Sequence, residues 1–175
     1  ILPGDSVDIE ALSFHEGQLY VGLKAPQTPA GAAIILKVQE VRAALKSGVL
    51  SPSLITKFAE LPLAVESVPS GGKVAEGISD MGFLPDGSLL LVANSPKKLP
   101  PDGGGALWWR KQDGSVEMLR RFPGLKPEGI SLSDDKKSIV VVFDNDRKPP
   151  LWLHLPIPKQ TPPPPPVSSK KKPDR

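Results

Sequence analysis

Three stretches of the chain share one pattern of apolar and polar positions. Residues 8–26, 77–96 and 127–146 each contain a short apolar strand, a polar turn and a second, more strongly apolar strand. The turns are polar and Gly-containing or Asp-rich, as in the Pro-Asp-Gly-Ser run at 85–88, and such residues favour the backbone angles of tight turns. The pattern therefore predicts three β-hairpins.

Further strands follow each hairpin. The second stretch continues through an Asp-Gly turn at 113–114, a strong hairpin signal, and its unit is predicted as four antiparallel strands at 78–84, 88–94, 105–111 and 115–122. Residues 32–38 and 151–155 continue the first and third units. A spacing of 49 residues separates Ser79 from the matching Glu128. Four-stranded sheets repeated at this spacing are typical of a β-propeller, so we predict an all-β fold with about three blades.

The first unit is longer, because 69 residues separate Glu10 from Ser79. We assign the excess to an insertion at residues 39–70 that carries two short helices. One helix covers 40–46 and ends at Gly48, and the other starts at Ser51-Pro52, a cap followed by a first-turn proline. Their apolar residues are expected to cover the sheet, with a partner groove as the alternative: Leu45, Leu50, Leu54, Ile55, Phe58 and Leu61.

Residues 1–158 are assigned to propeller blades. Propellers need four to eight blades to close, and the first residue is Ile, not Met. We therefore expect the C-terminal part of a larger propeller. Trp108 and Trp109 point to opposite faces of one strand, with one expected in the core and the other at the surface.

Charge separates the last residues from the rest. Residues 159–175 contain five basic residues and one acid, a charge of +4, and the remaining chain carries −1. The blades thus lack the basic footprint of a nucleic-acid-binding protein. The proline-lysine segment is predicted to be a disordered tail that acts as a solvated spacer, with two alternatives: a ligand for a proline-reading domain, or a weak anchor to an anionic surface through Lys170–Lys172.

Composition excludes further classes of protein and site. The chain has no cysteine, which excludes disulfides, thiolate metal sites and a cysteine nucleophile. No apolar run approaches the length of a membrane span.

Acidic residues recur near the start of the first strand of each unit. Glu10, Asp80 and Glu128 take these positions, and Asp8 lies two residues before Glu10. In a propeller the first strands line the central channel, and converging carboxylates provide the oxygen ligands that Ca²⁺ prefers. We therefore predict a calcium site at the channel mouth. The alternatives are that these carboxylates accept backbone N–H bonds and lock neighbouring blades together, or act in catalysis.

Three short motifs resemble an uncharacterised bacterial β-propeller family related to the phytase-like propellers. Residues 9–26 resemble its "EGL…LYLGLRGP" stretch, residues 77–81 its "GIRDL" segment and residues 127–130 its "PEGL" segment. The chain departs from the family at Lys24 and Ser79, where the family has Arg, and at Ala11, where it has Gly. The resemblance implies a bacterial protein, calcium and phosphate chemistry at acidic channel residues, and substrate contacts by Lys24 and Ser79.

The function that these features favour is a binding scaffold for a small molecule or a protein, with calcium as a candidate ligand. One alternative is a phytase-like, calcium-dependent hydrolase of phosphate or other esters. Such an enzyme needs basic residues around the acidic channel mouth, and Lys24, Lys73 and Lys126 are the candidates. The other is a protein-interaction module that uses the tail or the rim. Whether the chain catalyses a reaction stays open, and a periplasmic or secreted location is favoured over the cytoplasm.

Overall fold

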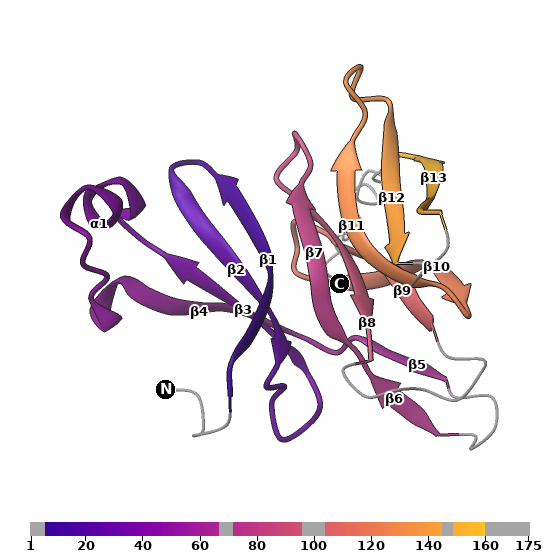
Figure 1. The fold of residues 1–175 in the computed structure, drawn as a ribbon, viewed down its shortest axis with the longest axis horizontal. Helices are drawn as coiled ribbons and strands as arrows, with labels where there is room; N and C mark the ends of the chain where they lie inside the picture. The colour runs from indigo at the N-terminus through magenta and orange to yellow at the C-terminus, as the bar shows by residue number, and fades with distance from the viewer. Residues whose placement is uncertain (1–5, 67–71, 96–103, 145–148, 160–175) are drawn as a thin grey trace, which may run out of the picture.

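The computed structural model describes residues 6–66, 72–95, 104–144 and 149–159. These residues form four antiparallel sheets of two to four strands, with one α-helix and one short 3₁₀-helix (Figure 1). The predicted all-β fold is confirmed. The predicted tail at 159–175 lies outside the described residues except for its first residue.

The first sheet is a meander in which each strand pairs with the next along the chain. Its strands are β1 (Asp8–His15), β2 (Gln18–Ala25), β3 (Ala33–Val38) and β4 (Ile55–Leu61). The turn between β1 and β2 is Glu16-Gly17, and both residues have positive φ. Such a two-residue turn matches the right-handed twist of paired strands, so the first predicted hairpin is confirmed.

Residues 39–70 differ from the predicted insertion. α1 (Val41–Ser47) forms as expected and ends at Gly48, which adopts the left-handed conformation that stops a helix. The second predicted helix is wrong: Ser51 caps a single 3₁₀ turn, η1 (Pro52–Leu54), and the chain then enters β4. The β-branched and aromatic residues of β4 favour a strand, and β4 pairs with β3 along its length.

The apolar residues of this segment fall into two groups. Leu61 is buried, and Phe58 packs against the core. Leu45 and Leu50 are exposed, so the expectation that they cover the sheet is wrong.

Two further sheets and a ribbon follow. The central sheet contains β7 (Gly77–Phe83), β8 (Leu89–Asn94), β9 (Gly104–Arg110) and β10 (Val116–Pro123). The third sheet contains β11 (Lys126–Leu132), β12 (Ser138–Asp144) and β13 (Leu151–Pro156), and the ribbon pairs β5 (Ala64–Glu66) with β6 (Lys73–Ala75). The four predicted strands of the second unit are confirmed, whereas the third sheet has three strands, not four, within the described residues.

The central sheet is covered on both faces. One hydrophobic core joins it to the first sheet, and a second joins it to the third. Trp108 belongs to the first core and Trp109 to the second, so the expected surface position for one of them is wrong. The indole of Trp108 donates to Glu76 and that of Trp109 to Ser88, which satisfies both buried N–H groups.

The three sheets are joined through their first strands. β1, β7 and β11 lie side by side and run in the same direction (Figure 1). Each strand carries a β-bulge at the same point of the repeat, where Glu10, Ser79 and Glu128 are left without a partner on the neighbouring strand. A bulge redirects the side chain of its extra residue. The matched positions of the sequence repeat are therefore also matched in backbone geometry.

The close approach of the first and central sheets requires a glycine at 77. A Cβ on Gly77 would lie 2.1 Å from the backbone oxygen of Lys24, whereas a Cβ on Gly82 in the same strand would meet no atom within 4 Å. We expect Gly77→Ala to lower the free energy of unfolding by about 2 kcal/mol or more, because the backbones must separate. Gly82→Ala should leave it unchanged within about 1 kcal/mol. Urea denaturation of both variants measures the difference, and equal losses would contradict the argument.

Candidate functional site

A buried lysine connects the first sheet to the central sheet. Lys24 lies near the end of β2 and is 4% exposed. Its Nζ is 3.1 Å from a carboxylate oxygen of Glu10 and donates to Ser79 Oγ at 2.7 Å. It also donates to the side-chain oxygen of Asn94. A buried ammonium needs such partners, because burial of an unpaired charge costs several kcal/mol.

Asn94 makes the equivalent connection from the central sheet to the third. Its side-chain amide donates to Ser79 Oγ at 2.8 Å, to the backbone oxygen of Pro127 at 3.1 Å and to Glu128 Oε1 at 3.4 Å. Lys24 and Asn94 take equivalent positions in their sheets. Lys24 follows Leu23, which pairs with the residue just before the bulge at Glu10. Asn94 follows Ala93, which pairs with the residue just before the bulge at Ser79. Each binds the bulge residue of its own sheet and that of the next. We call the five residues Glu10, Lys24, Ser79, Asn94 and Glu128 the strand-start network.

Asp80 holds β11 against β7. Its Oδ2 accepts the backbone N–H of Ile130 at 2.8 Å, and its Oδ1 accepts that of Met81 at the same distance. Burial raises the pKa of Asp80, and the two backbone hydrogen bonds oppose this shift. The carboxylate therefore accepts backbone N–H groups and joins two neighbouring sheets, which is the kind of contact that was the alternative to metal binding. Asp8 lies exposed at the start of β1.

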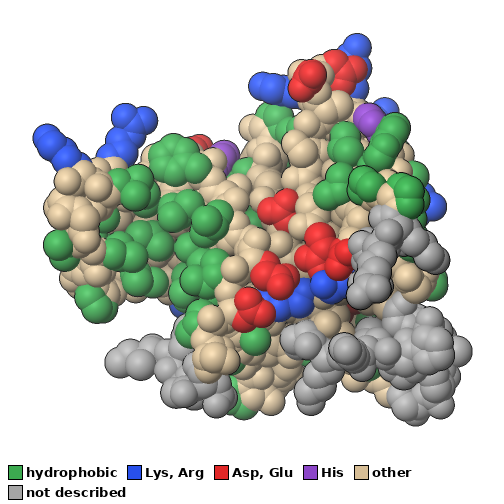
Figure 2. All heavy atoms as spheres, viewed as in Figure 1, with side chains coloured by type: hydrophobic (Ala, Val, Ile, Leu, Met, Phe, Trp, Pro, Cys, Tyr) green, Lys and Arg blue, Asp and Glu red, His purple; other side chains and the backbone are tan. Residues whose placement is uncertain are grey.

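Lys126 covers the outer side of the network. Its Nζ is 2.5 Å from Glu128 and 3.8 Å from Asp144. The hydrogen bond to Glu128 raises the pKa of Lys126, so this lysine stays charged. Figure 2 shows acidic and basic side chains gathered at the centre of the face in view. Lys24 pairs with Glu10, and Lys126 pairs with Glu128 and lies near Asp144.

The predicted calcium ligands do not form a common site. Within the described part of the chain, no group of three or more His, Asp or Glu side chains is placed to hold a metal ion. Glu10 and Glu128 are paired with lysines, and Asp80 accepts backbone N–H groups. Calcium binding at Glu10, Asp80, Glu128 and Asp8 stays a prediction. The predicted substrate contacts, Lys24 and Ser79, are buried and bonded to each other.

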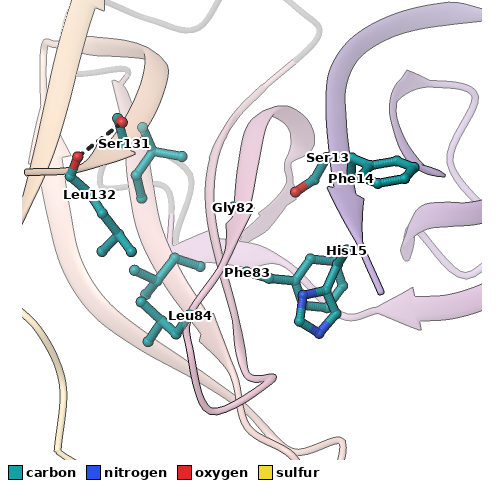
Figure 3. Close-up of a pocket in the computed structure, with 10 residues that line it drawn as sticks. Ser13, Phe14, His15, Gly82, Phe83, Leu84, Ser131 and Leu132 are labelled. Atoms are coloured by element: carbon teal, nitrogen blue, oxygen red, sulfur yellow. Dashed lines mark hydrogen bonds between the residues drawn. The ribbon is translucent and has the colours of Figure 1, made fainter. Parts of the chain in front are cut away.

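A cavity of about 270 Å³ opens at the end of β1, β7 and β11 that is opposite the strand-start network (Figure 3). We call it the strand-end pocket. It is lined by Ser13, Phe14 and His15 from β1, Gly82, Phe83 and Leu84 from β7 and its end, Leu90 from β8, and Ile130, Ser131 and Leu132 from β11. Sequence reasoning missed it, although the three hairpin units supply it from matched positions.

The pocket has an apolar floor, and Ser13 and Ser131 lie on either side of it. Ser13, Gly82 and Ser131 each lie three residues after the bulge residue of their strand. Gly82 carries no side chain, and the space above it is open. Ser13 and Ser131 therefore flank a gap, and the Ser131 hydroxyl donates to the backbone oxygen of Leu132 at 3.1 Å. His15 stacks on Phe83 with ring centroids 4.2 Å apart and planes 7° from parallel, which forms a flat wall.

Sequence reasoning also missed Glu76, a fully buried acid between β6 and β7. Its Oε2 accepts the indole N–H of Trp108 at 2.9 Å, while its Oε1 has no hydrogen-bond partner. Burial raises the pKa of Glu76 to about 7, against the opposing effects of the Trp108 bond and the charges of Arg121 and Lys24. Asn94 was missed as well, and alignment with Lys24 across the repeat would have found it.

No protein-family model matches the chain, and no curated protein is significantly similar to it.

In the part of the chain that the structure describes, no helix has both the length and the apolar character to cross a membrane.

Removal of the Lys24 ammonium should destabilise the fold. Lys24→Met leaves Glu10, Ser79 and Asn94 without their shared donor, and we expect a loss of about 2 to 4 kcal/mol in the free energy of unfolding. Lys126→Met is the matched control, because its ammonium is half-exposed and should contribute less than about 1 kcal/mol. Chemical denaturation compares them, and a small effect at Lys24 would show that the network does not hold the sheets together.

Glu76 should make stability depend on pH. Its pKa rises from an ordinary 4.5 to about 7 on folding, so the folded chain holds the proton more tightly than the unfolded chain. The proton on Glu76 therefore stabilises the folded chain fully at pH values below the unfolded pKa of 4.5, and this stabilisation is lost as the pH rises through the folded pKa of about 7. The free energy of unfolding should fall by roughly 3 kcal/mol over this range. Glu76→Gln stays neutral and should lack this fall. Unfolding of both proteins across this range measures it, and identical pH profiles would refute the assignment.

Proposed function

We propose that the chain forms blades of a β-propeller and acts as a non-catalytic binding scaffold. Three antiparallel sheets are packed face to face through two hydrophobic cores. Their first strands β1, β7 and β11 also contact one another in sequence order. The bulges at Glu10, Ser79 and Glu128 repeat, and so do the contacts made by Lys24 and Asn94. A repeated packing step of this kind is what builds a propeller. These observations support the proposal beyond the spacing of the sequence repeat.

The scaffold binds its ligand in the strand-end pocket. The observation that carries this proposal is the gap at Gly82 between Ser13 and Ser131, over a floor of Leu and Ile side chains. An apolar cavity with a few polar groups is the usual form of a small-molecule site. The wall made by Phe83 and His15 suits a flat ring, and the hydroxyl of Ser13 suits a hydroxyl or amide on it. We therefore assign the pocket to a neutral, ring-bearing group of a small molecule or a peptide.

The hydrolase alternative has less support. It needs basic side chains free to contact a phosphate or ester, and Lys24 is buried among its three partners while Lys126 is paired with Glu128. Lys73 lies on β6, in the ribbon. The strand-start network thus supports a structural role, and the pocket supports a binding role.

The experiment is a two-dimensional NMR titration of the chain with phenol and with N-acetyltyrosinamide. We expect shifts in the amides of Ser13, Gly82 and Ser131, with a dissociation constant of about 1 mM for phenol. Gly82→Val fills the gap and should abolish the shifts. Met118→Val introduces the same side chain at an exposed strand position and should retain them. Saturating probe without shifts at the three amides would overturn the pocket assignment.

A further inference from the structure

The three strands that line the strand-end pocket have backbone groups as well as side chains to offer a ligand. Within the described residues, β1, β7 and β11 each pair with a single strand of their own sheet. In an antiparallel pair, alternate residues bond to the neighbouring strand, and the residues between them direct both N–H and C=O to the other side. Asp80 of β7 accepts the backbone N–H of Ile130 in β11, and β1 also contacts β7. The unpaired sides of these strands therefore meet in the space between the sheets.

The hydrogen bonds at the turns show which residues of β7 and β11 direct their backbone to this space. The N–H of Leu84 donates to the backbone oxygen of Ser88 across the turn that follows β7, at 2.8 Å. Phe83, one residue earlier, therefore directs its N–H and C=O away from β8. The N–H of Ser133 makes the same kind of bond across the turn after β11, at 2.9 Å. Leu132 therefore directs its N–H and C=O away from β12.

Phe14 takes the same position in β1. The two residues that flank a two-residue hairpin turn bond to each other, so His15 bonds across the turn and Phe14 directs its backbone away from β2. Phe14, Phe83 and Leu132 each lie four residues after the bulge residue of their strand, and all three line the pocket. The repeat therefore brings three matched sets of backbone donors and acceptors to one cavity.

Phe14 offers the most complete of these sets. Its ring points away from the side of the pocket on which Ser131 and Leu132 lie (Figure 3), so Phe14 lines the cavity with its backbone. In the described part of the chain, no backbone hydrogen bond outside the sheet ladders reaches it. The backbone oxygen of Leu132, by contrast, accepts the hydroxyl of Ser131. A ring that fills the gap at Gly82 covers β7 and presents its edges to β1 and β11, so the edge facing β1 meets a donor and an acceptor together.

We propose, on the basis of the proposed function, that the ring bound in the strand-end pocket is a planar cyclic amide. Its ring C=O accepts the N–H of Phe14, and its adjacent ring N–H donates to the C=O of Phe14. A neighbouring strand answers such a backbone residue with the same two groups, and a cyclic amide holds them side by side on one edge of a flat ring. Backbone groups removed from water need partners of this kind.

The same space is too short for an added peptide strand. Asp80 accepts the backbone N–H groups of Met81 and Ile130, both at 2.8 Å. The unpaired sides of β7 and β11 are therefore closed two residues before Phe83 and Leu132, and the turns follow directly after those residues. A strand needs several consecutive backbone pairs, whereas one amide group needs a single pair. The cavity of about 270 Å³ likewise suits one ring.

The test is an NMR titration of the chain with two isomers that differ only in the placement of the same groups. 2-Pyridone carries its N–H and C=O on adjacent ring atoms, whereas 4-pyridone carries them on opposite sides of the ring. We expect 2-pyridone to bind about tenfold more tightly, because 4-pyridone makes only one of the two hydrogen bonds at a time. The amide proton of Phe14 should move downfield with 2-pyridone, as the proton of a newly bonded N–H does.

Two substitutions at Phe14 separate its backbone from its side chain. Phe14→Pro removes the N–H that faces the pocket, and it leaves the ladder with β2 intact because that N–H bonds to no strand. Phe14→Ala removes the same exposed ring and keeps the N–H, so it is the matched control. We expect the proline variant to bind 2-pyridone about tenfold more weakly than the alanine variant. Phenol has no carbonyl, so its affinity should change less. Circular dichroism verifies that both variants fold.

The outcomes separate the cyclic amide from the pocket itself. Equal affinities for the two pyridones, while phenol still shifts the amides of Ser13, Gly82 and Ser131, would overturn the cyclic amide and leave the pocket as a ring-binding site. Equal binding of 2-pyridone by the two Phe14 variants, or equal weakening of 2-pyridone and phenol by the proline, would overturn the role of the Phe14 backbone. If the proline variant does not fold, the two isomers on the unaltered chain decide. Phenol and both pyridones without shifts would overturn the pocket and, with it, the proposed function.

Discussion

The ammonium of Lys24 is the group on which the arrangement of the sheets most depends. It is buried, so it must keep its contacts to Glu10, Ser79 and Asn94 or lose several kcal/mol. These partners come from the first and central sheets, and Asn94 continues the connection to Glu128 in the third. The requirement to satisfy one charge therefore holds the starts of β1, β7 and β11 at fixed separations.

The two ends of β1, β7 and β11 consequently differ in character. At the start, polar groups satisfy one another, and backbones approach so closely that Gly77 has no space for a side chain. At the other end, Gly82 of the central sheet takes the position that Ser13 and Ser131 have in the other two sheets, and a cavity opens between these serines. A rigid end and a hollow end suit a scaffold whose recognition occurs where the strands are less tightly joined.

Local signals predicted the hairpins well and the helical segment poorly. Turn residues such as Asp113-Gly114 determine their own geometry, and the four strands of the central sheet formed where expected. Ser51 and Pro52 are a genuine helix start, yet their helix stops after one turn. The hydrogen bonds that β4 forms with β3 outweigh the local preference, and a window of sequence does not contain that partner. The acidic candidates Glu10 and Glu128 were located correctly in the repeat, whereas their lysine partners decide whether a metal could bind.

By itself, the sequence determined the all-β class, the hairpins and the repeat, because alternation and turn chemistry act over a few residues. Only the tertiary structure decided which carboxylates are paired with lysines, that Trp108 and Trp109 are both buried, and that burial raises the pKa of Glu76 to about 7. Burial, pairing of charges and desolvation depend on side chains brought together from distant positions. Lys24 and Ser79 are 55 residues apart in sequence, and no local pattern shows that they share a hydrogen bond.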